Sequence, residues 1–515
     1  MIRRRHFLAI HLLSPLTLNL STAPDTAAWR PRLHYTPQRH WINDPNGLFF
    51  LDGEYHAYYQ YNPGGATWGD IGWGHAVSSD LLNWQERPLA LPATDDEMAF
   101  SGSIVIDEHN VSGLQPAGAT RPVLLAYYTR YDRRSKVQSQ CLAYSTDGGD
   151  SFVRWAGNPL LDIGSLEFRD PYVFRHEASG RWVMLVVLAL ERQVVVYTSD
   201  DLLRWRKASV FGAACATADT IWEVPVLLPL PVDGEPGLQR WVLFVSINGG
   251  TRWGGSGVQY FVGNFDGERF VLDPAAAADA VRWGDHGRDF YAPLPFARKP
   301  GIVDAPGARP VWMGWMNNWD YAREVPSAPW RGQLSLPREL SLARQDRGWC
   351  LVQRVALAVE RARRPALLDL HACPAAEAAR ALAALAPHGR QWRATLRAAR
   401  HAVVQPLVLS VFTGSGAPVR VGFDPVLDSY FIDRRKPSPA FAGESEIHHA
   451  PRDRSRDAVE LEVWVDGCTV ELFADGGRVV LSDLVFPDPA ADGVALSHGS
   501  ANPVLAAFSL EPLQA

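Results

Sequence analysis

Short strand patterns follow one another from residue 33 to residue 342, and this series constrains the fold more than any other feature of the sequence. Each segment is rich in β-branched and aromatic residues and is bounded by Gly, Asp, Asn or Pro, as strands commonly are. No long segment with helical periodicity interrupts the series. Clear examples are residues 55–61, 123–128, 182–187 and 241–246. The sequence therefore predicts an all-β fold.

A short turn motif recurs within this series. Residues 79–84, Ser-Asp-Leu-Leu-Asn-Trp, return as Asp-Asp-Leu-Leu-Arg-Trp at 200–205, with looser copies at 145–152 and 265–270. The copies lie roughly 55 to 70 residues apart, which suits a four-stranded propeller blade better than a solenoid repeat. We predict a five-bladed β-propeller over residues 29–345. The alternative is a chance likeness among turn motifs.

The pattern changes after the propeller region. We predict a linker over residues 346–372 and a β-sandwich over residues 373–515, because short strand patterns resume after residue 405. The pair Asp466-Gly467 fits a hairpin turn between two of these strands. Between about residue 354 and residue 400 the chain is rich in Ala and Arg, which favours either a helix or a strand-poor start of the second domain.

The first residues have the pattern of an export signal. Three arginines at positions 3–5 precede an apolar stretch, and small residues follow it, so we expect residues 1–28 to be a signal peptide. The run Arg-Arg-His-Phe-Leu at 4–8 also resembles the twin-arginine pattern, with an ordinary Sec signal as the alternative. We therefore expect a secreted or periplasmic protein.

The net charge and the positions of the cysteines limit which partners and cofactors the sequence suggests. The net charge is −6 and the positive charges are scattered, so nucleic-acid binding is not indicated. No apolar run approaches the roughly 20 residues that a membrane span needs. The five cysteines lie far apart, no His/Cys cluster has zinc spacing, and no Gly-rich phosphate loop is present. We expect no cofactor and no metal, and most of the cysteines to be buried packing residues.

Three acidic residues stand in contexts that are unusual for a solvated surface. Asp44 and Asp170 each precede a proline at a strand start, and Glu223 lies in the apolar run Ile-Trp-Glu-Val-Pro. With Ser101 marking the second blade, positions 44, 101, 170 and 223 follow the blade spacing. Equivalent positions on the innermost strands converge on the axis of a propeller, so we predict one site with three carboxylates. Hydrolysis of a glycosidic bond needs two carboxyl groups. Singly, each residue could merely cap a turn.

The neighbours of these residues suggest how they divide the chemistry. Trp222 and Val224 flank Glu223 and would desolvate it, which raises a carboxyl pKa and favours a general acid. Asp44 has polar neighbours, which favour the charged form that a nucleophile needs. If the side chain of Arg169 meets Asp170, Asp170 stays ionised and cannot be the acid.

Aromatic and amide side chains that could bind a sugar lie near these motifs. Sugar faces stack on indole rings, and amides bond hydroxyl groups, although core packing is the usual role of a tryptophan. His75 could be catalytic, but a lone histidine after glycine is more often a structural hydrogen-bonding residue. The predicted substrate-binding residues are Asn43, Gln60, Trp68, Phe100, Ser101, Arg169 and Trp319.

At these residues the chain resembles glycoside hydrolase family 32, the β-fructosidases, and within it the bacterial levanase and exo-inulinase branch. Residues 41–47, Trp-Ile-Asn-Asp-Pro-Asn-Gly, look like the nucleophile motif of the family, and Arg169-Asp170-Pro171 like its transition-state-stabilising motif. Residues 222–225 look like its acid/base motif, except that Val224 stands where the family usually has Cys. The Ala- and Arg-rich stretch at 373–400 is also atypical. Further likeness lies at 68–76, 100–103, 314–321, 330–342, 430–434 and 469–473.

The resemblance implies a five-bladed propeller with a β-sandwich, and a retaining, exo-acting β-fructosidase that releases fructose from levan- or inulin-type fructans and from sucrose. It assigns the nucleophile to Asp44, the acid/base to Glu223 and transition-state stabilisation to Asp170. Two alternatives stay open: a fructosyltransferase that uses the same intermediate, and a fructan-binding protein without catalysis. The sequence leaves linkage preference, exo against endo action, the sandwich's role and the oligomeric state undecided.

Overall fold

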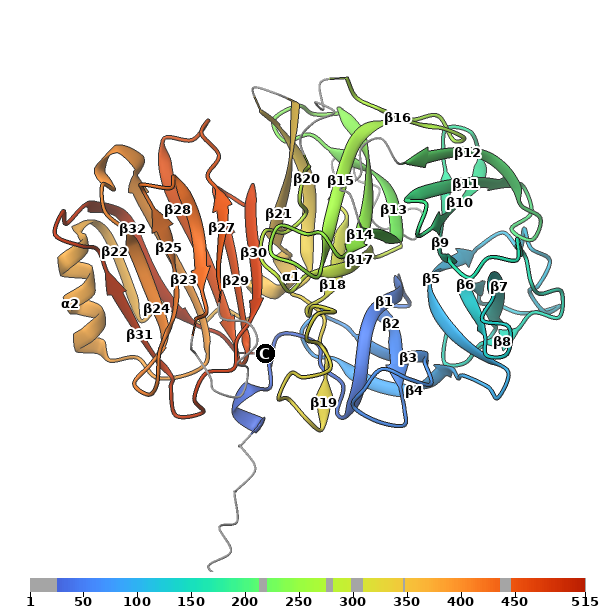
Figure 1. The fold of residues 1–515 in the computed structure, drawn as a ribbon, viewed down its shortest axis with the longest axis horizontal. Helices are drawn as coiled ribbons and strands as arrows, with labels where there is room; N and C mark the ends of the chain where they lie inside the picture. The colour runs from blue at the N-terminus through green and yellow to red at the C-terminus, as the bar shows by residue number, and fades with distance from the viewer. Residues whose placement is uncertain are drawn as a thin grey trace, which may run out of the picture.

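The computed structural model describes residues 26–212, 220–274, 281–297, 309–345, 348–435 and 446–514. The described chain forms a propeller and a sandwich that lie side by side (Figure 1). Of the signal peptide predicted over residues 1–28, all but the last three residues lie outside the described ranges, which begin with the short helix η1 (Thr26–Trp29). No helix among the described residues is long and apolar enough to cross a membrane.

Five sheets make up the propeller, and each is built outward from an innermost strand. The first contains β1 (His40–Leu51), β2 (Glu54–Asn62), β3 (Gly72–Ser78), β4 (Gln85–Leu91) and the short parallel strand β19 (Trp330–Arg331). The second contains β5 (Glu97–Asp107), β6 (Val123–Asp132), β7 (Gln138–Ser145) and β8 (Val153–Arg154). The third contains β9 (Phe168–His176), β10 (Arg181–Leu188), β11 (Gln193–Ser199) and β12 (Arg206–Gly212).

The remaining two sheets complete the ring. The fourth contains β13 (Ile221–Pro231), β14 (Gln239–Asn248), β15 (Ser256–Phe265) and β16 (Phe270–Leu272), and the fifth β17 (Tyr291–Pro295), β18 (Val311–Trp315), β20 (Arg338–Gln345) and β21 (Gly348–Val355). Strand β1 contacts β5, β5 contacts β9, β9 contacts β13, β13 contacts β17, and β17 returns to β1. The innermost strands therefore surround one axis, and the predicted all-β propeller is confirmed.

The recurring Asp-led motif is one turn used again in successive blades. In the first blade Asp80 Oδ1 accepts the amides of Leu82 (3.0 Å) and Asn83 (2.8 Å), and in the third Asp201 Oδ1 accepts those of Leu203 (3.0 Å) and Arg204 (2.7 Å). The motif joins the third strand of a blade to the fourth, where an aspartate can bond the amides of a tight turn. The repeat thus marks real blades and is no chance likeness.

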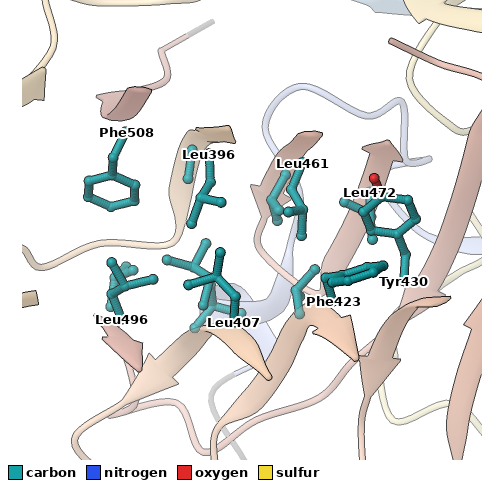
Figure 2. Close-up of a cluster of buried hydrophobic side chains, with 14 of the residues drawn as sticks. Leu396, Leu407, Phe423, Tyr430, Leu461, Leu472, Leu496 and Phe508 are labelled. Atoms are coloured by element: carbon teal, nitrogen blue, oxygen red, sulfur yellow. The ribbon is translucent and has the colours of Figure 1, made fainter. Parts of the chain in front are cut away.

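The C-terminal region is the predicted β-sandwich. One sheet contains β22 (Leu368–Pro374), β32 (Val504–Pro512), β23 (Gln391–Ala399), β28 (Ala458–Asp466), β29 (Thr469–Ala474) and β30 (Val479–Leu484). The other contains β27 (Ile447–Pro451), β26 (Ser429–Asp433), β25 (Val419–Asp424), β24 (Leu407–Thr413) and β31 (Gly493–Ser497). Apolar side chains of the two inner faces meet between the sheets, as Figure 2 shows for Leu396, Leu461 and Phe508 of one sheet and Leu407, Phe423 and Leu496 of the other.

The boundary between the domains differs from the prediction. Residues 348–355, placed in a linker by the sequence, form β21, which pairs with β20 along its whole length and closes the fifth blade. Without β21 the edge of β20 would be unpaired. The second domain likewise begins before residue 373, with β22. Along the chain, a short connection that contains the helix α1 (Leu357–Glu360) leads from β21 to β22.

The Ala- and Arg-rich stretch contains both a helix and a strand. Helix α2 (Ala375–Leu385) covers one end of the sandwich, in agreement with the helical preference of its residues. The next part, β23, alternates buried Trp392, Ala394 and Leu396 with arginines on the other face. One of these, Arg393, pairs with Glu462 at 2.9 Å. High arginine content hid this period-2 pattern in the sequence.

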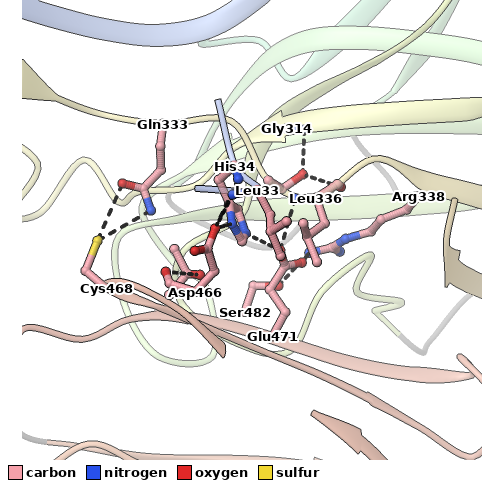
Figure 3. Close-up of polar contacts among 12 residues, drawn as sticks. Leu33, His34, Gly314, Gln333, Leu336, Arg338, Asp466, Cys468, Glu471 and Ser482 are labelled. Atoms are coloured by element: carbon pink, nitrogen blue, oxygen red, sulfur yellow. Dashed lines mark hydrogen bonds and ion pairs between the residues drawn. The ribbon is translucent and has the colours of Figure 1, made fainter. Parts of the chain in front are cut away.

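A buried polar cluster joins the two domains (Figure 3). Asp466, at the predicted hairpin turn between β28 and β29, accepts the amides of Arg32 and Leu33 and lies 2.9 Å from His34 Nδ1. The other ring nitrogen of His34 lies 2.8 Å from Glu471 Oε1, and Glu471 also pairs with Arg338 of the fifth blade. The N-terminal segment is thereby held between propeller and sandwich.

Candidate active site

The innermost strands are irregular where the predicted carboxylates stand. Each strand contains a proline there, which cannot donate to the ladder, and the pairing register shifts around Asp44, Asp170 and Glu223. Asp170 (φ 64°) and Val224 (φ 42°) have left-handed backbone conformations, which are strained for residues other than glycine. Bulges of this kind re-aim side chains, and here they occur at equivalent positions of successive blades.

Asp44 is buried at the inner end of the first blade. Its Oδ2 accepts a hydrogen bond from Ser101 Oγ at 2.8 Å, whereas Oδ1 is buried without a hydrogen-bond partner among the described residues. Burial raises the pKa of Asp44 to about 7, and the charge of Glu223 adds to the rise. The prediction that polar neighbours keep this carboxyl permanently charged is therefore wrong, because burial outweighs them.

Asp170 reaches the same region from β9. Its Oδ2 accepts the backbone N–H of Val224 at 2.9 Å, and its own backbone N–H donates to Thr129 Oγ1 at 2.8 Å. The side chain of Arg169 does meet it, with Nε 3.9 Å from Oδ2. Burial nevertheless raises the pKa of Asp170 to about 7, because the Arg169 charge only partly opposes desolvation.

Glu223 is the most exposed of the three carboxylates, with 19% of its side chain accessible. Its Oε1 lies 3.1 Å from Nη2 and 3.2 Å from Nε of Arg169, and its Oε2 accepts a hydrogen bond from the Tyr291 hydroxyl. Trp222 and Val224, expected to desolvate it, instead pack into two hydrophobic clusters. Side chains that are adjacent along a strand point to opposite faces, so sequence neighbours do not form its surroundings.

The three carboxylates are close enough for their charges to interact. Glu223 raises the pKa of both Asp44 and Asp170, and Asp44 adds to the rise at Asp170. The structure thus brings together residues from β1, β9 and β13, as the blade register predicts. Such a set can combine an attacking carboxylate with a proton donor, which is the chemistry of glycosidic cleavage.

Tyr291 belongs to this site and was missed by the sequence prediction. It contributes the hydroxyl that holds Glu223, and all three carboxylates act on its pKa, which burial raises well above the usual value. A signal was present: Tyr291-Ala292-Pro293 repeats the spacing of Glu223-Val224-Pro225, and position 291 continues the blade series. Ala292 (φ 49°) also repeats the backbone of Val224.

The predicted substrate-binding residues fall into three groups. Ser101 and Arg169 contact the carboxylates directly, as described above. The aromatic residues form two ring clusters: Phe100 stacks on Tyr131 at 4.9 Å with Trp68 at its edge, and Trp319 stacks on Trp41 at 5.9 Å.

The two predicted amide ligands bond to the protein itself. Asn43 Oδ1 accepts from Trp41 Nε1 at 2.7 Å, and Gln60 Nε2 donates to the carbonyl of Ala99 at 3.1 Å.

His75 has the structural role that its sequence context favours. It is buried, stacks on Tyr58 at 4.2 Å, and its Nε2 lies 3.1 Å from His56 Nδ1. Burial lowers the pKa of His75 to about 3 and that of His56 to about 4, so both rings are neutral. Within the described ranges no group of three His, Cys, Asp or Glu side chains is arranged to hold a metal ion. Cys141, Cys350, Cys373 and Cys468 are free and buried, and Cys215 lies outside those ranges.

Two family models match the chain. Residues 34–354 match the glycosyl hydrolases family 32 N-terminal domain, and residues 370–511 match the C-terminal domain of the same family. The gap between the two matches coincides with the short connection between β21 and β22. The levanase of Bacillus subtilis (strain 168) is 36% identical over 526 residues, which cover 99% of this chain and 75% of the levanase.

Other relatives agree with this assignment. The extracellular exo-inulinase of Aspergillus niger is 34% identical over 499 residues, which cover 89% of this chain and 90% of the relative. The crystal structure of exo-inulinase from Aspergillus awamori has a TM-score of 0.85 and 30% identity, and covers 95% of this chain and 98% of its own. A β-fructofuranosidase from Schwanniomyces occidentalis, complexed with fructosyl-erythritol, has a TM-score of 0.82 and 28% identity, and covers 96% and 100%.

Proposed function

Because the chain belongs to glycosyl hydrolases family 32, we propose that it is a retaining, exo-acting β-fructosidase that releases terminal fructose from levan- or inulin-type fructans and from sucrose. It is a glycoside hydrolase, as its levanase and exo-inulinase relatives are. The observation that carries the mechanism is the convergence of Asp44, Asp170 and Glu223 on one axis, with Arg169 and Tyr291 bonded to Glu223.

In the proposed mechanism Asp44 attacks the anomeric carbon of the terminal fructosyl unit through Oδ1, the oxygen that has no hydrogen-bond partner in the described part of the chain. Glu223 gives its proton to the leaving oxygen and then takes one from the water that hydrolyses the fructosyl-enzyme. Asp170 bonds the ring hydroxyls and stabilises the positive charge that develops. Retention requires the Asp44 and Glu223 carboxyl groups to lie about 5 Å apart.

Mutual repulsion prepares the two carboxyl groups for these roles. The charge of Glu223 raises the pKa of Asp44, so the state with both groups ionised is disfavoured. When Glu223 holds a proton, this repulsion disappears and Asp44 ionises more easily. Repulsion therefore favours the states in which only one of the two carboxyl groups is charged, and the productive state, with Asp44 charged and Glu223 protonated, is one of them.

We further propose that the protein is exported. The charged start and apolar stretch of residues 1–28 support export, and relatives of this chain are described as extracellular. The twin-arginine route predicts that replacing both Arg4 and Arg5 with lysine blocks export. If the variant is exported normally, the signal uses the Sec route.

Chromatography of the products from levan, inulin and sucrose tests the proposed activity. Exo cleavage gives free fructose alone from either polymer, whereas a ladder of oligosaccharides would contradict it. Longer fructosides made from concentrated sucrose would instead show a fructosyltransferase. The Asp44→Asn variant is the matched control, because it keeps the size of the side chain and removes the nucleophile. Near-normal turnover in that variant would refute the assignment of Asp44.

A further inference from the structure

A short segment of the fifth blade lies along the edge of the sandwich. We call residues 285–291 the interdomain strap. Its backbone bonds to β30 of the sandwich, since His286 N donates to Val480 O at 2.8 Å and Asp289 N donates to Ser482 O at 2.9 Å. Asp285 in turn accepts the amide and hydroxyl of Ser482, at 2.9 and 2.7 Å. The strap is thus bonded to the sandwich at successive residues.

The centre of this contact is a buried ion pair. Asp289 Oδ2 accepts from Arg434 Nη1 at 2.9 Å and from the amide of Leu484 at 2.8 Å, and Asp289 Oδ1 accepts from the Tyr321 hydroxyl at 2.5 Å. Arg434, which follows β26 of the sandwich, also donates to Tyr321 at 3.0 Å and to the carbonyl of Leu484 at 2.8 Å. Side-chain exposure is 1% for Arg434 and 0% for Asp289. Both carboxylate oxygens of Asp289 are therefore fixed from outside the strap.

The same segment ends in the active site. Tyr291 stands two residues after Asp289, at the start of β17, and its hydroxyl donates to Glu223. The following residue, Ala292, has a left-handed backbone and donates its amide to Ser246 Oγ at 3.0 Å. Only Phe290 separates Asp289 from Tyr291 along the chain, and Tyr291 begins β17, so the backbone at Asp289 sets where the strand starts. A shift of Asp289 is therefore transmitted to Tyr291.

We propose that Arg434 of the sandwich is a positioning residue for the acid/base: it anchors Asp289, which fixes the strap and so places the Tyr291 hydroxyl on Glu223. This inference rests on the proposed role of Glu223. It gives the sandwich a part in catalysis beyond bracing. The groups that face Glu223 are Arg169, Asp170, Asp44 and Tyr291, and only Tyr291 is linked to the sandwich through the strap.

The electrostatics of the pair explain why its loss would reach the site. Removing a partner from a buried ion pair leaves an uncompensated charge, and the structure around it rearranges. Tyr291 donates to the charged form of Glu223, and a hydrogen bond of this kind favours that form. If the strap moves, this bond weakens and the charged Glu223 carboxylate is stabilised and positioned less well. The alkaline limb of the pH profile of kcat reports the group that acts as the general acid in the enzyme–substrate complex.

The experiment compares Arg434→Lys and Tyr321→Phe with the control Asp466→Asn in the full chain. The lysine keeps the charge but loses the planar fork that bonds Asp289, Leu484 and Tyr321 together. The control weakens the domain interface at Asp466, whose carboxylate hydrogen bonds go to residues 32–34 and Gln391 and not to the strap, whereas Arg338 of the same cluster pairs with Asp285 at 2.9 Å. We expect kcat to fall about tenfold with KM nearly unchanged, and the alkaline limb to rise by roughly half a pH unit, in the first two variants only.

A double-mutant cycle that combines Arg434→Lys with Tyr291→Phe tests whether Arg434 acts on the site through the Tyr291 hydroxyl. Once the Tyr291 hydroxyl is absent, Arg434→Lys should change neither kcat nor the alkaline limb further. Additive effects, or an equal loss in Asp466→Asn, would show that Arg434 only stabilises the fold and would overturn the proposal. If Tyr291→Phe itself left kcat and the pH profile unchanged, Tyr291 would not position Glu223 and this proposal would fail, whereas full activity in Glu223→Gln would overturn the proposed role of Glu223 itself.

Discussion

At the residue scale, each of the three carboxylates is held by groups that belong to other blades. Asp44, Asp170 and Glu223 could be found because they recur at the blade spacing and stand beside prolines. Their environments depend on side chains from other blades: Ser101 on Asp44, and Arg169 and Tyr291 on Glu223. The residues next to Asp44 in the sequence predicted a charged carboxyl group. Its pKa is instead raised by burial between blades, which depends on the tertiary structure.

Ser101→Ala tests the environment of Asp44. The Ser101 hydrogen bond lowers the pKa of this carboxyl, so its loss should raise that pKa further. A rise of about one unit would move the acid limb of the kcat/KM profile upward and lower activity roughly tenfold below it. Ser103→Ala is the matched control, because this equally buried serine bonds to Pro171 and Val173 instead. An unchanged acid limb in Ser101→Ala would contradict the assignment.

Val224 offers a test of strain beside the acid/base. A β-branched residue with φ 42° is unfavourable, because its Cβ substituents crowd the backbone. Val224→Cys removes the branching at the cost of one buried methyl group, and it restores the residue usual in the family. We expect the free energy of unfolding to rise by about 0.5–1 kcal/mol, measured by urea denaturation, with activity retained. A loss of stability would show that the packing of the valine outweighs the strain.

At the element scale, the turns and strands were largely predictable, and the domain boundary was not. Asp80 and Asp201 mark equivalent turns in the sequence. An aspartate whose carboxylate bonds the amides of its own turn forms a motif that can be recognised locally. Strand β21 belongs to the fifth blade only through its pairing with β20, which no local pattern reveals. Strand β23 was not recognised in the sequence. Its arginines pair with glutamates of the neighbouring strand, such as Glu462, and this pairing cannot be seen from the local sequence.

The histidine pair of the first blade predicts how stability depends on acid. The pKa values of His56 and His75 fall to about 4 and about 3 in the folded protein, below the usual 6.5. The unfolded chain therefore binds more protons below pH 6.5, and stability should fall as the pH drops from 6.5 towards 4 and below. Urea denaturation at several pH values should show that the free energy of unfolding of His56→Asn declines less steeply with falling pH than that of the unsubstituted protein. Equal slopes would contradict neutral burial.

At the scale of the whole molecule, the sequence predicted two domains but not the charged cluster between them. His34, Arg338, Asp466 and Glu471 are far apart in the chain, and nothing around each residue suggests a common location. Hydrogen bonds that the His34 ring donates to Asp466 and Glu471 overcome the effect of burial and raise the pKa of His34 to about 9. The cluster therefore holds the domains together as an ion pair at neutral pH.

His34→Gln should weaken this interface. Since the pKa of His34 rises from 6.5 to about 9, its stabilisation is complete below pH 6.5 and is lost as the pH rises through 9. Breaking a buried pair costs about 3–5 kcal/mol, so at pH 6 the variant should lose roughly that much unfolding free energy. The difference should shrink above pH 9. His388→Gln, which removes an exposed histidine paired with Asp492, should change little at either pH.

Identification of the covalent intermediate tests the account most directly. In Glu223→Gln the fructosyl-enzyme lacks its general base, so β-fructofuranosyl fluoride, whose leaving group needs no acid, should make the intermediate accumulate. Proteolysis and mass spectrometry of the quenched protein should then find one hexosyl unit on the peptide that contains Asp44. A hexosyl unit on Asp170, or none on any peptide while fluoride is released, would contradict the assignment of Asp44 as the nucleophile.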